Sequence, residues 1–168
     1  GSYSTPFFCD IDNDGLFDLF SGSGDGELWF YRNTGTVQNA QWAPPNTNYL
    51  GSFADESCPA LVDIDNDGLY ELFVADDGRQ IVFYDNIGSP EEPLWAAGIT
   101  NYLSVAEGYK GLSFADIDND QDQDMIIGWL GGQMGFYENH GSPEHPLWTN
   151  GAANYLAMDF GLASAPAL

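Results

Sequence analysis

Three short stretches of this sequence carry an acidic residue at nearly every second position. The first begins at Asp10 and reads DIDNDGLFD, and the pattern returns as DIDNDGLYE from Asp63 and as DIDNDQDQD from Asp116. In a tight turn the side chains at positions 1, 3 and 5 point to one centre, which the carbonyl at position 7 and the acid at position 9 also face. Five or more oxygen ligands suit a hard cation, and Ca²⁺ accepts loose geometry more readily than Mg²⁺.

We therefore predict three structural calcium sites. Without a cation, two carboxylates about 4 Å apart repel each other by about 4 kcal/mol at an effective dielectric constant of about 20, so an acidic turn without an ion is the disfavoured alternative. No nucleophile or proton-transfer pair accompanies the acids. The predicted ligands are the carboxylates of Asp10, Asp12, Asp14, Asp18, Asp63, Asp65, Asp67, Glu71, Asp116, Asp118, Asp120 and Asp124, with the backbone carbonyls of Leu16, Leu69 and Asp122.

Two further positions of the loops refine this prediction. An EF-hand is excluded because position 12 holds Ser21, Val74 or Ile127 in place of a bidentate glutamate. Position 6 is glycine in the first two loops, which permits a sharp turn, whereas the third loop has Gln121 there. A glutamine in a left-handed turn carries strain, so we expect the third site to be weaker or differently shaped.

The acidic loops belong to a repeat of 53 residues, which separates Asp10, Asp63 and Asp116. Other landmarks keep the same interval without insertion, which indicates three copies of one structural unit. These landmarks are Asn33, Asn86 and Asn139, then Trp42, Trp95 and Trp148, then Tyr49, Tyr102 and Tyr155.

Each unit reads as four short strands. An apolar run precedes the acids, a second run follows them, and a Gly-rich turn leads to an aromatic third strand. A Gly/Pro loop then leads to Trp and to an NYL segment as the fourth strand. A period of about 50 residues with four strands is typical of β-propeller blades, so we predict an all-β fold of antiparallel, propeller-type blades. The predicted boundaries are 1–53, 54–106 and 107–161 for three blades, and 162–168 for the first strand of a further unit.

The composition limits the partners and the setting of the chain. With 26 acidic residues against three Lys and Arg, the formal net charge of -23 argues against binding to nucleic acid or to an anionic membrane surface. No apolar run approaches the length of a membrane span, of about 18 residues. The absence of a signal peptide and of an initiator Met indicates a mature product or a fragment. Cys9 and Cys58 are interpreted as small buried side chains, with a disulfide as the alternative.

The loop pattern D-x-D-x-D-G-x-x-[DE], the F-Y-x-N-x-G motif and S-x-P before the first strand of two units together resemble the FG-GAP/VCBS repeats, which also form the integrin alpha-subunit propeller. The resemblance covers essentially the whole chain. It implies calcium in the loop between the two inner strands of each blade, an extracellular or cell-surface location, and roles in adhesion or ligand binding. Such propellers have about seven blades, so we expect three blades to join copies of themselves or further blades of a longer chain.

The first functional hypothesis is a non-enzymatic, calcium-binding extracellular module for adhesion or self-assembly. The alternatives are a lectin-like propeller that binds glycans between its blades, and an accessory segment of a secreted polysaccharide-active enzyme. The repeated Trp and Tyr residues fit packing between blades better than stacking on sugars. His140 and His145 form only a weak candidate for a transition-metal site. No catalytic motif such as G-x-S-x-G is present, so no catalytic residue is predicted.

Overall fold

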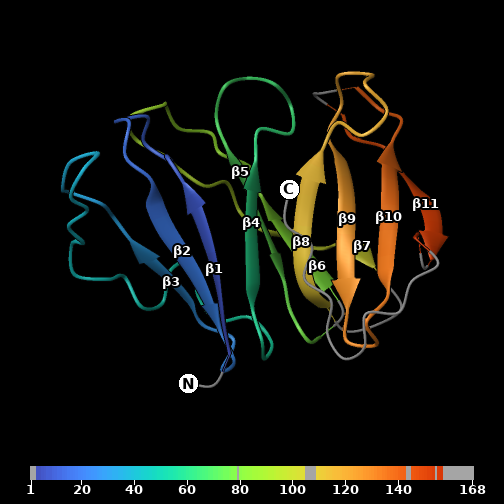
Figure 1. Cartoon of the computed structure of the whole chain (residues 1–168), viewed down its shortest axis with the longest axis horizontal. Helices are drawn as coiled ribbons and strands as arrows, with labels where there is room; N and C mark the ends of the chain where they lie inside the picture. Colours follow the sequence, from blue (N-terminus) through green and yellow to red (C-terminus); the bar gives the residue numbers. More distant parts are fainter. Residues whose placement is uncertain (1–2, 79, 105–108, 143–144, 154, 157–168) are drawn as a thin grey trace.

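The computed structural model describes residues 3–78, 80–104, 109–142, 145–153 and 155–156, and this part of the chain is all-β (Figure 1). It forms three antiparallel sheets in which consecutive strands pair, which confirms the predicted fold of blade-like units. The first sheet contains β1 (Ser4–Cys9), β2 (Asp18–Ser23) and β3 (Leu28–Tyr31). The second contains β4 (Cys58–Val62), β5 (Glu71–Ala75), β6 (Gln80–Tyr84) and β7 (Ile99–Ser104). The third contains β8 (Tyr109–Ala115), β9 (Asp124–Trp129), β10 (Met134–Asn139) and β11 (Trp148–Ala153).

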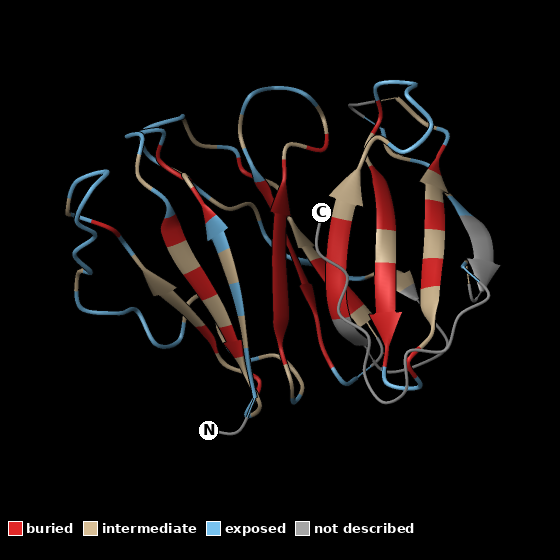
Figure 2. Ribbon diagram, viewed as in Figure 1, coloured by how far each residue is buried: buried red, intermediate tan, exposed pale blue. Residues whose placement is uncertain are grey.

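The three sheets stand side by side, with their first strands next to one another. Figure 1 shows β1, β4 and β8 in the middle of the molecule, while β3 and β11 lie at opposite ends. The second sheet lies between the other two, and β4 and β5 are therefore buried along their whole length (Figure 2). In β2, buried residues alternate with half-buried ones, because one face of the first sheet is uncovered.

Two apolar clusters hold the sheets together. The first sheet contributes Phe20 and Leu28 to one cluster, where they meet Leu72 of the second sheet. The opposite face of the second sheet contributes Phe73 to the other cluster, where it meets Ile127 of the third sheet. Each cluster is thus made by two neighbouring sheets.

Both cysteines are buried thiols that form no disulfide, and Cys9 lies in the first cluster and Cys58 in the second. The interpretation of Cys9 and Cys58 as small core side chains is therefore confirmed. Burial raises the pKa of the Cys9 thiol to about 12 and that of the Cys58 thiol to about 11, so both stay protonated and unreactive at neutral pH.

The fourth strands differ from the prediction. The first sheet has only three strands, and its NYL segment, residues 48–50, forms a turn. The chain runs beside β3 here, but Pro44 and Pro45 lack the N–H groups that a continuous ladder needs. In the second sheet the NYL segment is part of β7, whereas in the third unit β11 ends at Ala153 and the described residues Tyr155 and Leu156 form a turn. The predicted further strand at residues 162–168 lies outside the described residues.

Candidate metal centres

Each acidic loop connects the first and second strands of one sheet. The strand register places Cys9 opposite Asp18, and it places Val62 opposite Glu71 in the same way. Position 9 of each loop therefore lies directly across the ladder from the residue that precedes position 1. Because antiparallel pairing closes the loop at both ends, the acids between these residues are forced into a small volume.

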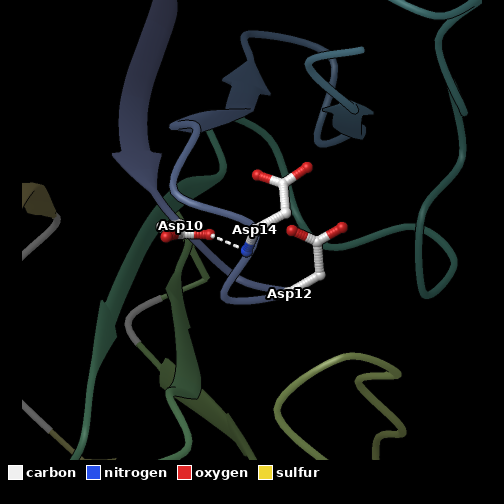
Figure 3. A group of neighbouring side chains, drawn as sticks. All are labelled: Asp10, Asp12 and Asp14. Atoms are coloured by element: carbon white, nitrogen blue, oxygen red, sulfur yellow. Dashed lines mark hydrogen bonds between the residues drawn. The ribbon is translucent and has the colours of Figure 1, made fainter. Parts of the chain in front are cut away.

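The backbone of the loop folds around the carboxylate at position 1. The N–H groups of Asp14 and Gly15 donate to the two oxygens of Asp10, at 3.1 and 3.0 Å, and Figure 3 shows the first of these bonds. The second and third loops repeat the bond from position 6, from Gly68 to Asp63 at 3.0 Å and from Gln121 to Asp116 at 3.1 Å. These bonds hold the turn in one shape in all three units.

The turn needs left-handed backbone at positions 4 and 6. Asn13 has a φ of 54° and Gly15 a φ of 85°, and Asn66, Gly68 and Asn119 repeat this conformation. Asparagine tolerates this region better than most residues, and glycine adopts it freely. Gln121 has a φ of 81°, so the third loop contains the left-handed glutamine that its sequence predicts. The backbone of this loop is therefore strained at Gln121.

In each loop, three carboxylates approach one another closely enough to share an ion. Within each group, one oxygen from each residue lies within 4.8 Å of the others. The groups are Asp10, Asp12 and Asp14 (Figure 3), then Asp63, Asp65 and Glu71, then Asp116, Asp118 and Asp120. The second group thus uses position 9 in place of position 5.

The remaining predicted ligands lie in the same loops but outside these groups. Position 5 of the second loop, Asp67, accepts a hydrogen bond from Leu69 N at 2.8 Å. Asp14 and Asp120 accept the same bond in their loops, from Leu16 and Asp122 at 2.8 and 3.0 Å. This contact places position 7 beside the cluster, and ligation by its carbonyl remains a prediction.

The acids at position 9 are buried and tie the loop to the rest of its sheet. Asp18 and Glu71 are 1% exposed, and Asp124 is fully buried. Asp18 accepts from Asn33 N at 2.7 Å, and Asp124 accepts from Asn139 N at 2.9 Å, so in these two units position 9 reaches the end of the third strand. Glu71 reaches back into its own loop, to Ile64 N at 2.9 Å.

The repeated asparagines have a role that the sequence did not reveal. The side-chain oxygen of Asn86 accepts from Gly88 N at 3.2 Å and from Leu94 N at 3.0 Å, and so closes the Gly/Pro loop before Trp95. Asn33 and Asn139 make the equivalent bonds in their units. Their spacing of 53 residues was the only signal for this function.

Several loop oxygens are buried without a hydrogen-bond partner. They are one carboxylate oxygen each of Asp12, Asp18, Asp63 and Glu71. An unsatisfied buried polar atom costs about 1–3 kcal/mol, and more when it is charged, so native proteins rarely leave one without a reason. Oxygen atoms that converge and lack a donor are what a hard cation requires. The residues present therefore fit a divalent ion of the calcium type.

Burial and neighbouring negative charges raise the pKa values of two loop acids. Burial raises the pKa of Glu71 to about 8, and the charges of Asp65, Asp67 and Asp63 add to this effect. Burial likewise raises the pKa of Asp18 to about 6, with contributions from Asp14 and Asp10. A bound divalent cation would favour the charged forms and reverse these shifts.

We expect the calcium-free protein to lose stability as the pH rises. The folded-state pKa of Glu71, about 8, exceeds its ordinary value of 4.5, so its stabilising contribution is complete below pH 4.5 and is lost as the pH rises through about 8. One unit of pKa shift corresponds to about 1.4 kcal/mol, so the total loss is on the order of a few kcal/mol. Urea unfolding in EGTA across this pH range measures it. Glu71→Gln, which stays neutral, is expected to flatten the curve, and a free energy of unfolding that rises with pH would contradict the prediction.

A basic side chain distinguishes the first loop from the others. Arg32, just after β3, forms an ion pair with the buried carboxylate of Asp12 at position 3. The second and third units have Asp85 and Glu138 at the equivalent place. In the second unit, the charge of Asp85 adds to the effects that raise the pKa of Asp65, after burial and the nearer acids of the loop. One loop is thus partly neutralised by the protein itself, while another receives additional negative charge.

Replacing Arg32 with alanine is expected to raise the calcium affinity of the first site by up to about fivefold. The substitution removes a competing cation from Asp12, and because the Arg32 side chain is exposed, solvent limits the contribution of this ion pair to about 1 kcal/mol. The reciprocal variant Asp85→Arg is expected to weaken the second site. Calorimetric titration at low salt, with Asp10→Asn to assign the first site, checks both changes. Unchanged affinities in both variants would refute the assigned role.

The other candidates from the sequence lie outside the acidic groups. His140 pairs with Glu138 at 3.4 Å, and neither His140 nor His145 belongs to a group of possible metal ligands among the described residues. Trp95 Nε1 donates to the hydroxyl of Tyr49 at 2.6 Å, across the boundary between the first and second sheets. This contact supports packing between blades as the role of the repeated aromatic residues.

Comparison with known proteins agrees with the repeat. A family model described as FG-GAP-like repeat matches residues 10–74 and, in a second match, residues 63–127. Each match begins at the first aspartate of one acidic loop and ends in the second strand of the next unit. Searches of curated proteins and of solved structures found no significant match. Among the described residues, no helix is long and apolar enough to cross a lipid bilayer.

Proposed function

Because the chain belongs to the FG-GAP-like repeat family, we propose that it is a non-enzymatic, calcium-binding extracellular module that works in adhesion or self-assembly. The observation that carries this proposal is the set of buried carboxylate oxygens without a hydrogen-bond partner in the first two loops, together with the three carboxylates that converge in every loop. Bound calcium would supply the positive charge that these oxygens lack. The loop carboxylates already organise their own backbone, which is the arrangement of a structural site.

An extracellular setting supports the calcium assignment. FG-GAP-like repeats are typical of extracellular and surface proteins. Extracellular modules bind calcium with dissociation constants of about 0.1–1 mM, so modest sites of this kind are filled where calcium is plentiful. The excess of acidic over basic residues, 26 against three, would also be partly neutralised there.

Calorimetric titration of the whole chain with calcium tests the proposal. We expect three bound ions per chain and a loss of one of them in Asp63→Asn, since Asp63 belongs to the second group of converging ligands. Asp25→Asn is the matched control, because Asp25 is an exposed acid in a turn outside the acidic loops. A folded protein that takes up no calcium at millimolar concentration would refute the proposal.

One observation favours the lectin-like alternative. A cavity of about 350 Å³ is lined by residues of the second and third units, with the loop acids Asp65 and Glu71 beside Tyr102 and His145. Acidic oxygens next to an aromatic ring provide both kinds of contact that a sugar uses. Retention on saccharide columns, reversed by a competing sugar and lost in His145→Ala, would support glycan binding at this cavity. The accessory-segment alternative would require a catalytic domain elsewhere in a longer protein.

A further inference from the structure

The two boundaries between sheets are built in the same way. Trp95 of the second unit donates to Tyr49 of the first at 2.6 Å, and Trp148 of the third donates to Tyr102 of the second at 3.2 Å. In each case the tyrosine ring also lies on a phenylalanine of its own sheet, at 5.1 Å from Phe30 for Tyr49. Each unit therefore presents a tyrosine to the unit that follows and a tryptophan to the unit that precedes.

These contacts define two different faces of a sheet. We call the face that meets the following unit the Tyr face and the face that meets the preceding unit the Trp face. In the first sheet the Tyr face contains Phe20, Leu28, Phe30 and Tyr49. In the second sheet the Trp face contains Leu61, Leu72, Val74, Tyr84 and Trp95. A Trp face and a Tyr face fit each other, and both pairs within the chain use this combination.

The Trp face of the first sheet is exposed. Phe8 is 55% exposed, whereas Leu61, at the equivalent position of the second sheet, is only 5% exposed. Trp42 is 43% exposed, and its ring lies 6.5 Å from that of Phe8. A cavity of about 560 Å³ adjoins both residues and is also lined by Phe17 and Val37. Exposed apolar surface of this kind, with a pocket in it, marks an interaction site.

The Tyr face of the third sheet is built in the same way as the Tyr faces of the first and second sheets. Tyr155 N donates to Met134 O at 2.8 Å, as Tyr49 N does to Leu28 O, and the Tyr155 ring stacks on Phe136 at 4.6 Å. Ile126 and Met134 are only half-buried on this face. Their equivalents in the second sheet, Phe73 and Ile81, are fully buried.

We propose that a second copy of this chain docks its Tyr face, from the third sheet, onto the Trp face of the first sheet. Trp42 Nε1 then donates to the hydroxyl of Tyr155 in the second copy, which continues the contact that the chain already makes twice. The occupant is a copy of this chain because a Tyr face is the surface that fits a Trp face at both internal boundaries, and the third sheet presents a Tyr face whose Ile126 and Met134 are only half-buried. The contact is head to tail, so repetition gives a closed ring or a filament. The inference deepens the self-assembly part of the proposed function.

Sedimentation velocity in calcium and moderate salt, over a wide range of protein concentration, tests this inference. Salt is needed because the net charge of -23 opposes association. We expect the average mass to rise above that of one chain. Trp42→Asp is expected to weaken association about tenfold or more, as loss of a central aromatic contact does, and Tyr155→Phe, which removes only the accepting hydroxyl, is expected to weaken it about fivefold. Ile87→Asp is the matched control, since Ile87 is exposed on a loop of the second unit.

A mixing experiment separates head-to-tail from symmetric association. Trp42→Asp keeps its Tyr face and a Tyr155→Asp variant keeps its Trp face, so the mixture is expected to form dimers of one chain of each kind and to stop there. Self-association of the Tyr155→Asp variant through paired Trp faces would overturn the proposal. A chain that stays monomeric at every concentration would also overturn it. In both cases, calcium uptake measured on the same samples decides separately whether the calcium-binding proposal stands.

Discussion

Removal of calcium is expected to lower the melting temperature of this protein by on the order of 10 °C. At a free calcium concentration of about ten times the dissociation constant, each site adds about 1.4 kcal/mol, so three sites add about 4 kcal/mol. A domain of this size shifts by about 2–4 °C per kcal/mol. The effect arises because the ions offset the repulsion among buried carboxylates at the start of the second strand of every sheet, such as Asp18 and Glu71.

Circular dichroism or scanning calorimetry in calcium and in EGTA measures this shift. Magnesium at the same concentration serves as the ion control, because it requires strict octahedral geometry and gives up water reluctantly. Asp63→Asn, which disables one of the three acidic groups, is expected to reduce the shift by about one third. Equal melting temperatures in calcium and in EGTA would show that the loops are stable without an ion.

Truncation of Phe73 to alanine is expected to cost about 3–5 kcal/mol, which is the largest effect we predict for one substitution. Phe73 is fully buried in the second sheet. Its ring lies 5.0 Å from Phe83 and 5.7 Å from Tyr102 in the same sheet, and 4.7 Å from Phe114 in the third. The substitution therefore opens a cavity within a sheet and also loosens its contact with the next one.

Chemical unfolding of Phe73→Ala and of Ile126→Ala tests this prediction with a control built into the repeat. Ile126 occupies the equivalent position of the third sheet, but on the half-buried Tyr face, so its truncation is expected to cost less than half as much. Both variants are measured in excess calcium, so that the calcium sites are filled. Equal costs for the two variants would mean that the outer face of the third sheet is as well packed as the interior.

The repeat made the local structure of this chain predictable. The acids that start at Asp10, Asp63 and Asp116 were predicted to join two strands, and in the structure each loop connects the first two strands of its sheet. The left-handed backbone of Gln121 followed from the glycines that the other loops have at the same position. These features depend on residues that are close in the chain, so alternation and turn chemistry are sufficient to reveal them.

The fourth strand was less predictable because its pairing depends on more than local sequence. The NYL segment has one spacing in all three units, yet it lies within a strand in the second unit, whereas Tyr49 in the first and the described Tyr155 in the third lie in turns. Whether it pairs depends on the residues before it, such as Pro44 and Pro45 in the first unit, and on the neighbouring strand that is available. Whether an outer strand pairs depends on contacts that are distant in sequence, so a shared local motif does not determine it.

By itself, the sequence determined the number of units, the order of the inner strands and the acidic residues that form each loop. Only the tertiary structure decided that Asp18 and Glu71 are buried, that Arg32 partly neutralises one loop, and that, among the described residues, the first and third sheets each have one face that is less buried. The reason is that side chains at equivalent positions acquire different solvation and different partners once the sheets stand side by side. The burial of a residue, its pKa and the exposed apolar area depend on that packing, so a repeated motif does not predict them.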